Sequence, residues 1–390
     1  MKTSFALVGA AFLLVAAAGC HIEISVPSST TSSSRNWKIE SQTVYSEALP
    51  GDIEVLVVEN HNGVVRIIGT DSGPGSWTQT LKVRAADELV LRQLTEAGTC
   101  KASGSGEFKL IVSPPAREQG SFTSDLEITV PKHVVVRAGN HYGSLTVLNI
   151  NTNIEALNQC GSIEIGDIGG AVKAQTSYAA MTVRNCGRAL LNNQCGSINA
   201  SDVRDRLEAG TSYAALNVRR VAGPVKLHNQ CGSVDAQDVG EAEAETSYGR
   251  LRLVNAAGRA RLVNQCGGIT ADRISGNLVA RTSYAELDVC ASGSNLICEN
   301  QSGRIKLRAT SDGLKEVQAR TSYAKLEVLL PSHLKPAIQA RTSYAGMRSD
   351  FPVLTGSGAL QQAADGLPRV QLENQAGEIV ISGSQFPEAK

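Results

Sequence analysis

One pair of phrases recurs through most of this 390-residue chain: NQCG, then TSYA after 17 or 18 residues, then NQCG again. This spacing holds from Asn140 to Asn300, and seven of the eight tyrosines occupy the third position of a phrase. The period is too short for two-helix repeats and lacks the leucine pattern of horseshoe repeats. It is typical of one coil of a parallel β-solenoid that carries two or three short strands.

The residues inside each coil support this interpretation. After each phrase, apolar and polar residues alternate, as in Ser197 to Ala200, and a second apolar stretch follows, as in Gly223 to Leu227. Alternation with a period of two predicts strands, and the intervening Gly, Asn, Asp and Pro predict turns. The predicted fold is all-β: a single-chain parallel β-solenoid, right-handed and β-helix-like, with coils of about 18 residues and an irregular N-terminal cap. Some twelve to fourteen coils would make a rod roughly 60 Å long.

Stacked coils place equivalent side chains about 4.8 Å apart. The first phrase position alternates Asn and Thr, which predicts a ladder of amides and hydroxyls. The third position alternates Cys and Tyr, which separates bulky rings by small side chains. Whether this third position points into the core or outward stays open, because a corner at the fourth position can reverse the alternation. The predicted ladder residues are Asn158, Asn193, Asn229, Asn264, Asn300, Tyr178, Tyr213, Tyr248, Tyr284, Tyr323, Cys160, Cys195, Cys231 and Cys266.

The fourth phrase position is Gly after Cys and usually Ala after Tyr. An alanine is poorly suited to a backbone with positive φ. The pattern therefore predicts limited room at a corner of the coil.

The cysteines do not form an obvious disulfide framework. The four in the NQCG phrases lie two coils apart, about 9.6 Å, whereas a disulfide needs Cα atoms closer than about 7 Å. We expect these four thiols to be free, and the same distance argues against a shared tetrahedral metal site. Two local pairs are candidate disulfides, Cys290 with Cys298 and Cys186 with Cys195, and Cys100 has no evident partner.

The N-terminus carries an export signal. Lys2 precedes an apolar run from Phe5 to Ala18, which is too short to span a membrane as a helix. The small residues before Cys20 resemble a bacterial lipobox, which implies cleavage before Cys20 and lipidation of its thiol and new amino terminus. A plain signal peptide is the alternative. His21 stands where an aspartate is associated with inner-membrane retention, which favours the outer membrane, and several acyl chains give stable anchoring.

The predicted organisation has five parts. Residues 1–19 are the signal peptide, 20–35 the lipidated cysteine and a Ser/Thr-rich tether, 36–135 an N-terminal β cap with one helix at Arg84 to Glu96, 136–383 the solenoid, and 384–390 a tail. Solenoids need capped ends. We expect a loop within 345–373 and the last strand, near Ile379 to Ile381, to close the C-terminal end.

The sequence offers little chemistry. Lys plus Arg equals Asp plus Glu, so the net charge of zero gives no support for nucleic-acid binding. HExxH, GxSxG and phosphate-loop motifs are absent, and we predict no catalytic, cofactor-binding or metal-binding residue. Aspartates such as Asp167, Asp202 and Asp238 recur after the NQCG strands. We expect turn residues that bind their own backbone, with cation or sugar binding as the alternative. His61 and His141 take the second phrase position and are expected to be polar turn residues.

Two stretches, DIEVLVVENHNGVVRIIGTD and SDLEITVPKHVVVRAGNHYGSLTVLNI, resemble the bacterial putative-adhesin family of unknown function. The resemblance covers about Asp52 to Gly383. It implies a parallel β-solenoid on an exported or envelope protein and brings no catalytic residues. The strict alternation of NQC and TSY is more regular than the pattern of that family.

Three functional hypotheses follow. The first is a lipid-anchored, non-enzymatic envelope rod for binding, adhesion or scaffolding, with a glycan, peptidoglycan or another envelope protein as partner. The second is a polysaccharide-processing enzyme on a parallel β-helix, which would need clustered carboxylates, or basic residues with a cation, on one face. The third is a scaffold that assembles end to end through its terminal coils.

Overall fold

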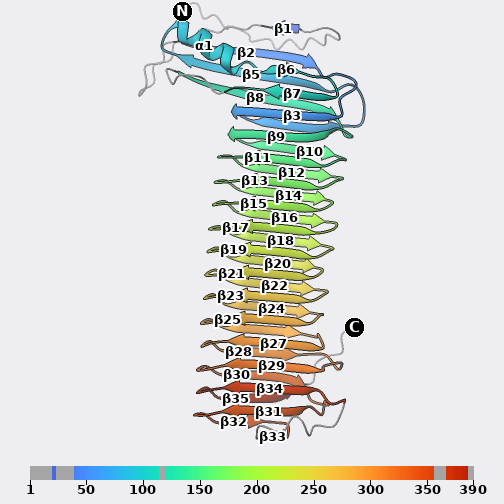
Figure 1. The fold of residues 1–390 in the computed structure, drawn as a ribbon, viewed down its shortest axis with the longest axis vertical. Helices are drawn as coiled ribbons and strands as arrows, with labels where there is room; N and C mark the ends of the chain where they lie inside the picture. The colour runs from blue at the N-terminus through green and yellow to red at the C-terminus, as the bar shows by residue number, and fades with distance from the viewer. Residues whose placement is uncertain (1–19, 23–38, 114–119, 355–365, 385–390) are drawn as a thin grey trace, which may run out of the picture.

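A computed structural model describes residues 20–22, 39–113, 120–354 and 366–384. The predicted signal peptide, most of the predicted tether and most of the tail lie outside these ranges. The described residues form a rod of stacked coils, with a helix at its N-terminal end (Figure 1). The predicted parallel β-solenoid is confirmed. Within these ranges, no helix has the length and apolar character needed to cross a membrane.

Each coil contributes one strand to each of two sheets. Along the repeats, each strand pairs in parallel with the equivalent strand of the next coil. Ile163 is thus in register with Met181 in one sheet, and Val172 with Ala189 in the other. The phrase NQCG or TSYA forms the corner that leads from the second sheet into the first. The period seen in the sequence is therefore the length of one coil.

The first sheet, sheet A, has 18 strands in the part of the chain that the structure describes. In spatial order they are β1 (Cys20–Ile22), β2 (Ile39–Ala48), β5 (Ser76–Ala85), β8 (Gly120–Pro131), β4 (Val65–Thr70), β10 (Leu145–Ile150), β12 (Ile163–Ile168), β14 (Met181–Cys186), β16 (Ile198–Val203), β18 (Leu216–Val221), β20 (Val234–Val239), β22 (Leu251–Ala256), β24 (Ile269–Ile274), β26 (Leu287–Ala291), β28 (Ile305–Ala309), β30 (Leu326–Pro331), β35 (Ile379–Ser384) and β32 (Met347–Ser349).

The second sheet, sheet B, faces sheet A across the core. In spatial order its strands are β6 (Lys101–Ser103), β7 (Glu107–Ile111), β3 (Val55–Asn62), β9 (Val135–Tyr142), β11 (Ile154–Asn158), β13 (Val172–Thr176), β15 (Ala189–Asn193), β17 (Leu207–Thr211), β19 (Val225–Asn229), β21 (Ala242–Thr246), β23 (Ala260–Asn264), β25 (Leu278–Thr282), β27 (Asn295–Asn300), β29 (Glu316–Thr321), β34 (Arg369–Asn374), β31 (Ala337–Thr342) and β33 (Val353–Leu354).

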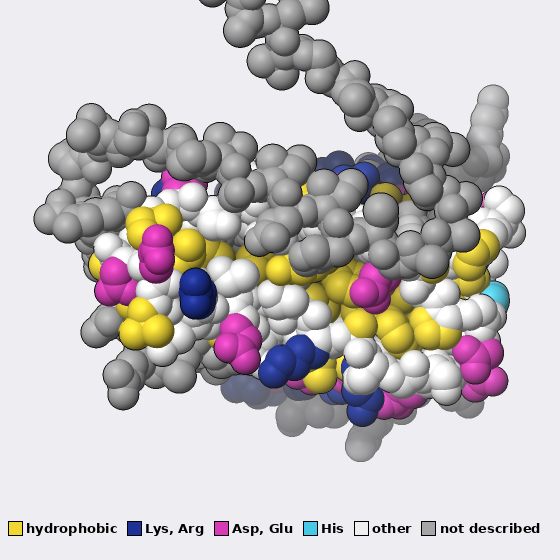
Figure 2. All heavy atoms as spheres, turned by 90° about the horizontal axis from the view of Figure 1, so that it is seen from above, with side chains coloured by type: hydrophobic (Ala, Val, Ile, Leu, Met, Phe, Trp, Pro, Cys, Tyr) yellow, Lys and Arg dark blue, Asp and Glu magenta, His cyan; other side chains and the backbone are white. Residues whose placement is uncertain are grey.

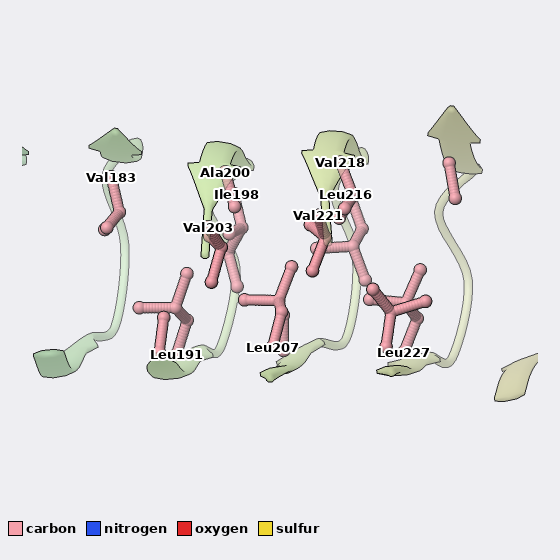
Figure 3. Packing of buried hydrophobic residues seen from close by; sticks show 14 of the residues in the cluster. Val183, Leu191, Ile198, Ala200, Val203, Leu207, Leu216, Val218, Val221 and Leu227 are labelled. Atoms are coloured by element: carbon pink, nitrogen blue, oxygen red, sulfur yellow. The ribbon is translucent and has the colours of Figure 1, made fainter. Parts of the chain in front are cut away.

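The core is a continuous aliphatic filling between the sheets. Leu191 and Leu207 on sheet B point toward Val203 and Val218 on sheet A, and the same arrangement repeats from coil to coil (Figure 3). These side chains are at most 1% exposed. Burial of apolar surface between successive coils is the main source of stability in a solenoid.

The N-terminal end is covered by an antiparallel extension of sheet A and by helix α1 (Glu88–Gly98). The helix starts later than predicted because Asp87 caps it, its carboxylate accepting from the Val90 N–H at 2.9 Å. Arg84 instead belongs to β5. Seen from above, hydrophobic side chains run across this end, with charged side chains around them (Figure 2).

The order of coils in space departs from the order in sequence at both ends. Strands β7 and β8 lie outside β3 and β4, so stacking begins near residue 55, well before the expected boundary at 136. At the other end, β34 and β35 lie between the coil of β29 and β30 and that of β31 and β32 (Figure 1). The segment predicted within 345–373 supplies β32 and β33 at this end of the rod, but the prediction that the last strand also closes it was wrong, because β32 lies beyond β35.

Candidate functional site

The corners formed by the phrases are held by the asparagine side chains. The amide of Asn193 donates to the main-chain carbonyl of Ala179 in the preceding coil at 2.7 Å, and its oxygen accepts from the Gly196 N–H at 3.0 Å. One side chain thereby joins two coils and fixes its own corner. The same pair of bonds recurs at Asn229, Asn264, Asn300 and Asn374.

The threonines of the alternate coils act in the same way. The hydroxyl of Thr211 donates to the carbonyl of Gly196 in the preceding coil at 3.0 Å. Amide and hydroxyl therefore bind backbone carbonyls, in place of the predicted direct ladder between the two side chains. The spacing explains this, because a corner carbonyl lies between successive side chains. The bond recurs at Thr176, Thr246, Thr282, Thr321 and Thr342.

The glycine after each phrase cysteine is explained by limited room at the corner of the coil. A Cβ on Gly196 would lie 2.0 Å from the carbonyl oxygen of Ala179 and 2.6 Å from the Asn193 amide nitrogen. The same carbonyl that accepts the asparagine bond thus leaves no space for a methyl group. Among the glycines of the NQCG phrases none has positive φ.

The third position of the phrases faces solvent, which settles the direction that the sequence left open. Tyr178 and Tyr213 are each 61% exposed, and Tyr323 is 65% exposed. Tyrosines and small residues alternate along one edge of the rod, and we name the tyrosines together the tyrosine row. The tyrosine row comprises Tyr142, Tyr178, Tyr213, Tyr248, Tyr284, Tyr323 and Tyr344.

Between these rings lie the phrase cysteines, of which Cys160 and Cys231 are exposed and Cys195 and Cys266 are partly buried. The eight cysteines whose side chains the structure describes are all free thiols.

The candidate disulfides are not formed. Cys290 lies on sheet A with its side chain turned outward, whereas Cys298 lies on sheet B and is fully buried. Cys186 is buried under sheet A, away from the surface row of Cys195.

The tyrosine row begins beside two histidines. The ring centroid of His61 lies 5.6 Å from that of His141 and 5.7 Å from that of Tyr142, and His141 Nδ1 lies 3.0 Å from Gln159 Oε1. Partial burial, followed by the charge of His141, lowers the pKa of His61. The first coils therefore carry an aromatic cluster where later coils carry Ser or Gln.

A shallow hollow of about 350 Å³ lies beside the tyrosine row on sheet B. The equivalent outward positions of neighbouring strands carry Asn192, Gly210 and His228, which are in register. Glycine supplies no side chain there, so the surface dips at the centre. The lining consists of Gln175, Thr176, Ser177, Asn192, Asn193, Gln194, Gly210, Thr211, Ser212 and His228.

A second hollow, of about 540 Å³, lies nearer the opposite edge of sheet B. Its lining combines apolar residues, such as Leu190, with charged side chains that form pairs, such as Lys173 with Glu155 at 2.7 Å and Arg206 with Glu208 at 3.6 Å. Exposed pairs of this kind contribute little to stability.

The opposite edge carries the recurring aspartates in left-handed backbone. Asp167, Asp202 and Asp238 have φ of 55° to 58°, a conformation that Asp tolerates. Their carboxylates accept from the next coil and not from their own backbone as expected: Arg220 binds Asp202 at 2.6 and 2.9 Å. Hydrogen bonding to Arg220 lowers the pKa of Asp202. Within the described ranges, no group of three or more His, Cys, Asp or Glu side chains could hold a metal ion.

Two solved structures are similar to this chain. No family model matches the chain, and no curated protein matches it. A protein described as a "putative cell adhesion protein" from Clostridium sporogenes is 8% identical, with a TM-score of 0.19, over 88% of this chain and 100% of its own. A "putative adhesin" from Parabacteroides distasonis is 10% identical, with a TM-score of 0.25, over 88% of this chain and 97% of its own.

Proposed function

We propose that this chain is a non-enzymatic binding protein of the bacterial envelope, anchored through lipid on Cys20, whose tyrosine row is the binding surface. One observation carries the proposal: identical aromatic side chains are exposed at every second coil along one edge of a rod. A row of exposed tyrosines is well suited to binding a partner, since each side chain combines a large apolar face with a hydroxyl that can remain hydrated at an interface.

The placement of Cys20 is compatible with this role. It begins β1, which pairs with β2 at the N-terminal end of sheet A. Lipid at that residue would hold the rod by this end, in the periplasm or at the cell surface, with the outer membrane as the favoured site. The tyrosine row would then extend away from the membrane.

The charges of the outer faces support binding over catalysis. Many carboxylates are paired with a cation of a neighbouring coil, as Glu299 is with Arg281 at 2.8 Å. A polysaccharide lyase or hydrolase needs free carboxylates or basic groups gathered at one place. The hypothesis of an enzyme is tested by incubating the purified protein with acidic polysaccharides and measuring the release of reducing or unsaturated ends. Turnover of the polysaccharide would contradict the proposal of a non-enzymatic binding protein.

Binding is tested with isolated envelopes. The mature protein, purified in detergent, is sedimented with envelope fragments and compared with two variants in which Tyr178, Tyr213, Tyr248, Tyr284 and Tyr323 are all changed to Ala or all to Phe. We expect the alanine variant to lose at least tenfold in bound protein and the phenylalanine variant to keep most of it. Equal sedimentation of all three proteins would contradict the proposal.

Lipidation is tested separately. Growth with labelled palmitate should label the wild-type protein and leave a Cys20→Ala variant unlabelled. Label in that variant would remove the anchor from the proposal.

A further inference from the structure

The neutral hollow beside Tyr178 and Tyr213 has the properties of a ligand site. We infer that it binds an uncharged, extended β-1,4-linked chain of hexopyranoses, laid along the rod with every second sugar stacked on a tyrosine. This inference rests on the binding function proposed above and adds the chemistry and the place of the ligand. The site spans β13, β15, β17 and β19, which lie next to one another near the middle of the rod (Figure 1).

The side chains that line the hollow favour an uncharged ligand. The lining contains amides, hydroxyls, one imidazole and one glycine, and no Asp, Glu, Lys or Arg. Amides and hydroxyls both donate and accept hydrogen bonds, which matches the hydroxyls of a neutral sugar. An anionic polymer is better bound by Arg or Lys. Charge complementarity therefore favours a neutral glycan at this hollow.

Gly210 opens the site. A Cβ at this residue would have only ordinary contacts, 3.5 Å from Asn192 Oδ1 and 3.8 Å from the His228 carbonyl oxygen. Packing therefore does not require glycine here, unlike at Gly196. A glycine within a strand often marks a bulge, a tight bend, or the close approach of a ligand or another backbone. Gly210 is regularly paired with Asn192 and His228, without a register shift, so there is no bulge at this position. In β13 the same outward position carries Gln175, so a full side chain is compatible with the coil.

The tyrosines are spaced for a polymer. Thr176 is in register with Asn193, and Asn192 with Gly210, so Tyr178 and Tyr213 are two coils apart. Two coils correspond to about 9.6 Å. The disaccharide unit of an extended β-1,4-linked chain is about as long as two strand spacings, and its alternate rings present the same face.

Each ring is available for stacking. Tyr178 and Tyr213 directly follow Ser177 and Ser212, two lining residues of the hollow, and each is 61% exposed. The electron-rich face of an aromatic ring attracts the slightly positive C–H groups on the apolar face of a pyranose. The aromatic rings can stack on the apolar face of a sugar, and the neighbouring amides can form hydrogen bonds with its hydroxyls.

The test is titration calorimetry of the mature protein in detergent with four probes: chitohexaose and cellohexaose, which are neutral and β-1,4-linked, maltohexaose, which is α-1,4-linked, and a hexamer of galacturonate, which is anionic. We expect saturable binding of at least one of the first two, at least tenfold weaker binding of maltohexaose, and no preference for the anion. Tighter binding of the galacturonate hexamer would overturn the assignment to neutral glycans.

Three variants locate the site. Gly210→Gln fills the hollow with the side chain found at Gln175 and should weaken binding at least tenfold, and Tyr213→Ala should do likewise. Leu89→Ala removes an exposed apolar side chain of helix α1, outside the tyrosine row and the hollow, and as the control it should change the affinity less than twofold. Circular dichroism checks that each variant is folded, and binding unchanged by Gly210→Gln would overturn the placement.

The outcomes separate this inference from the proposed function. If the five-alanine variant loses envelope binding but no hexasaccharide binds, the tyrosine row still binds and the glycan assignment fails. If light scattering shows a dimer that dissociates in the Tyr213→Ala variant, the partner at this edge is a second copy of the chain, and the glycan assignment also fails.

Discussion

The side-chain amide of Asn374 donates a hydrogen bond to the main-chain carbonyl of Ala324, 2.7 Å away, although 50 residues separate them in the chain. This bond places the last coil between two TSY coils that are adjacent in sequence. Thr321 and Thr342 each pair with Asn374 and not with each other. The alternation of Asn and Thr is thereby preserved in space where the sequence breaks it.

The first prediction concerns this inserted coil. Asn374→Ala removes a bond to Ala324 and one to the Gly377 N–H at 3.0 Å, leaving buried backbone groups without partners. Such a loss costs about 1–3 kcal/mol. Hydrogen exchange should therefore accelerate in β34 and β35 by tenfold or more. Gln375→Ala changes the exposed neighbour and serves as control. Equal exchange in the two variants would show that the amide does not hold the coil.

The second prediction compares adjacent glycines. A Cβ on Gly267 would lie 2.0 Å from the Gly249 carbonyl oxygen, whereas one on Gly268 would lie 3.3 Å from its nearest neighbour, the Glu286 carbonyl oxygen. Gly267→Ala should therefore lower the free energy of unfolding by about 1–3 kcal/mol through overpacking. Gly268→Ala should change it by less than about 1 kcal/mol.

Urea denaturation followed by circular dichroism measures both. Ser197 and Ser233 already occupy the position of Gly268 in other coils, so its tolerance is expected. Equal free energies of unfolding for the two variants and the wild type would contradict the tight packing at Gly267.

The third prediction concerns thiol reactivity. The thiolate is the reacting form of cysteine, and burial raises the pKa of Cys100 to about 12 and of Cys186 to about 11. A maleimide at pH 7.5 should label the exposed Cys160 and Cys231 within minutes and leave Cys100 and Cys186 unlabelled until the protein is unfolded. Mass spectrometry of digested samples, with and without reductant, identifies the sites. Early labelling of Cys186 would contradict the burial of sheet A's inner face.

The fourth prediction follows the pH dependence of stability. Burial raises the pKa of Cys298 from 9.0 to about 12, so the folded chain keeps a proton that the unfolded chain releases. This contribution is fully present below about pH 9. Above it, the free energy of unfolding should fall by about 1.4 kcal/mol per pH unit for this thiol, up to about pH 12.

Urea titrations between pH 8 and 11.5 measure this slope. Cys298→Ala should make the decline shallower, and Cys186→Ala should do so over a window that ends near pH 11. Identical slopes for the wild type and both variants would mean that these thiols are not buried as described.

The coil, its length and its strands could be predicted from the sequence, because every coil repeats the same alternation and register follows from the repeat. The outward direction of Tyr178 could not, since the corner at Ala179 determines which way the preceding residues turn. The hollow at Gly210 was also missed. An absent side chain has meaning only when its neighbours Asn192 and His228 are known to lie on either side of it.

The position of the last coil was missed for a different reason. Chain order suggested that Asn374 would follow Thr342 at the end of the rod. The signal was present, because two successive TSY phrases break the alternation, and from Asn193 onward each corner asparagine binds the carbonyl of a TSY phrase in the preceding coil, as Asn374 binds that of Ala324. The helix boundary shifted because Asp87, a strong N-cap, was read as part of the helix.

The most direct test of the tyrosine row as a binding surface is hydroxyl-radical footprinting of the tyrosines, with and without isolated envelopes. We expect Tyr178, Tyr213, Tyr248, Tyr284 and Tyr323 to be oxidised readily in the free protein and to be protected together on binding, while exposed side chains of the opposite edge, such as Arg220, keep their reactivity. Full oxidation of these tyrosines in the bound protein, with protection at the opposite edge, would contradict this role of the tyrosine row.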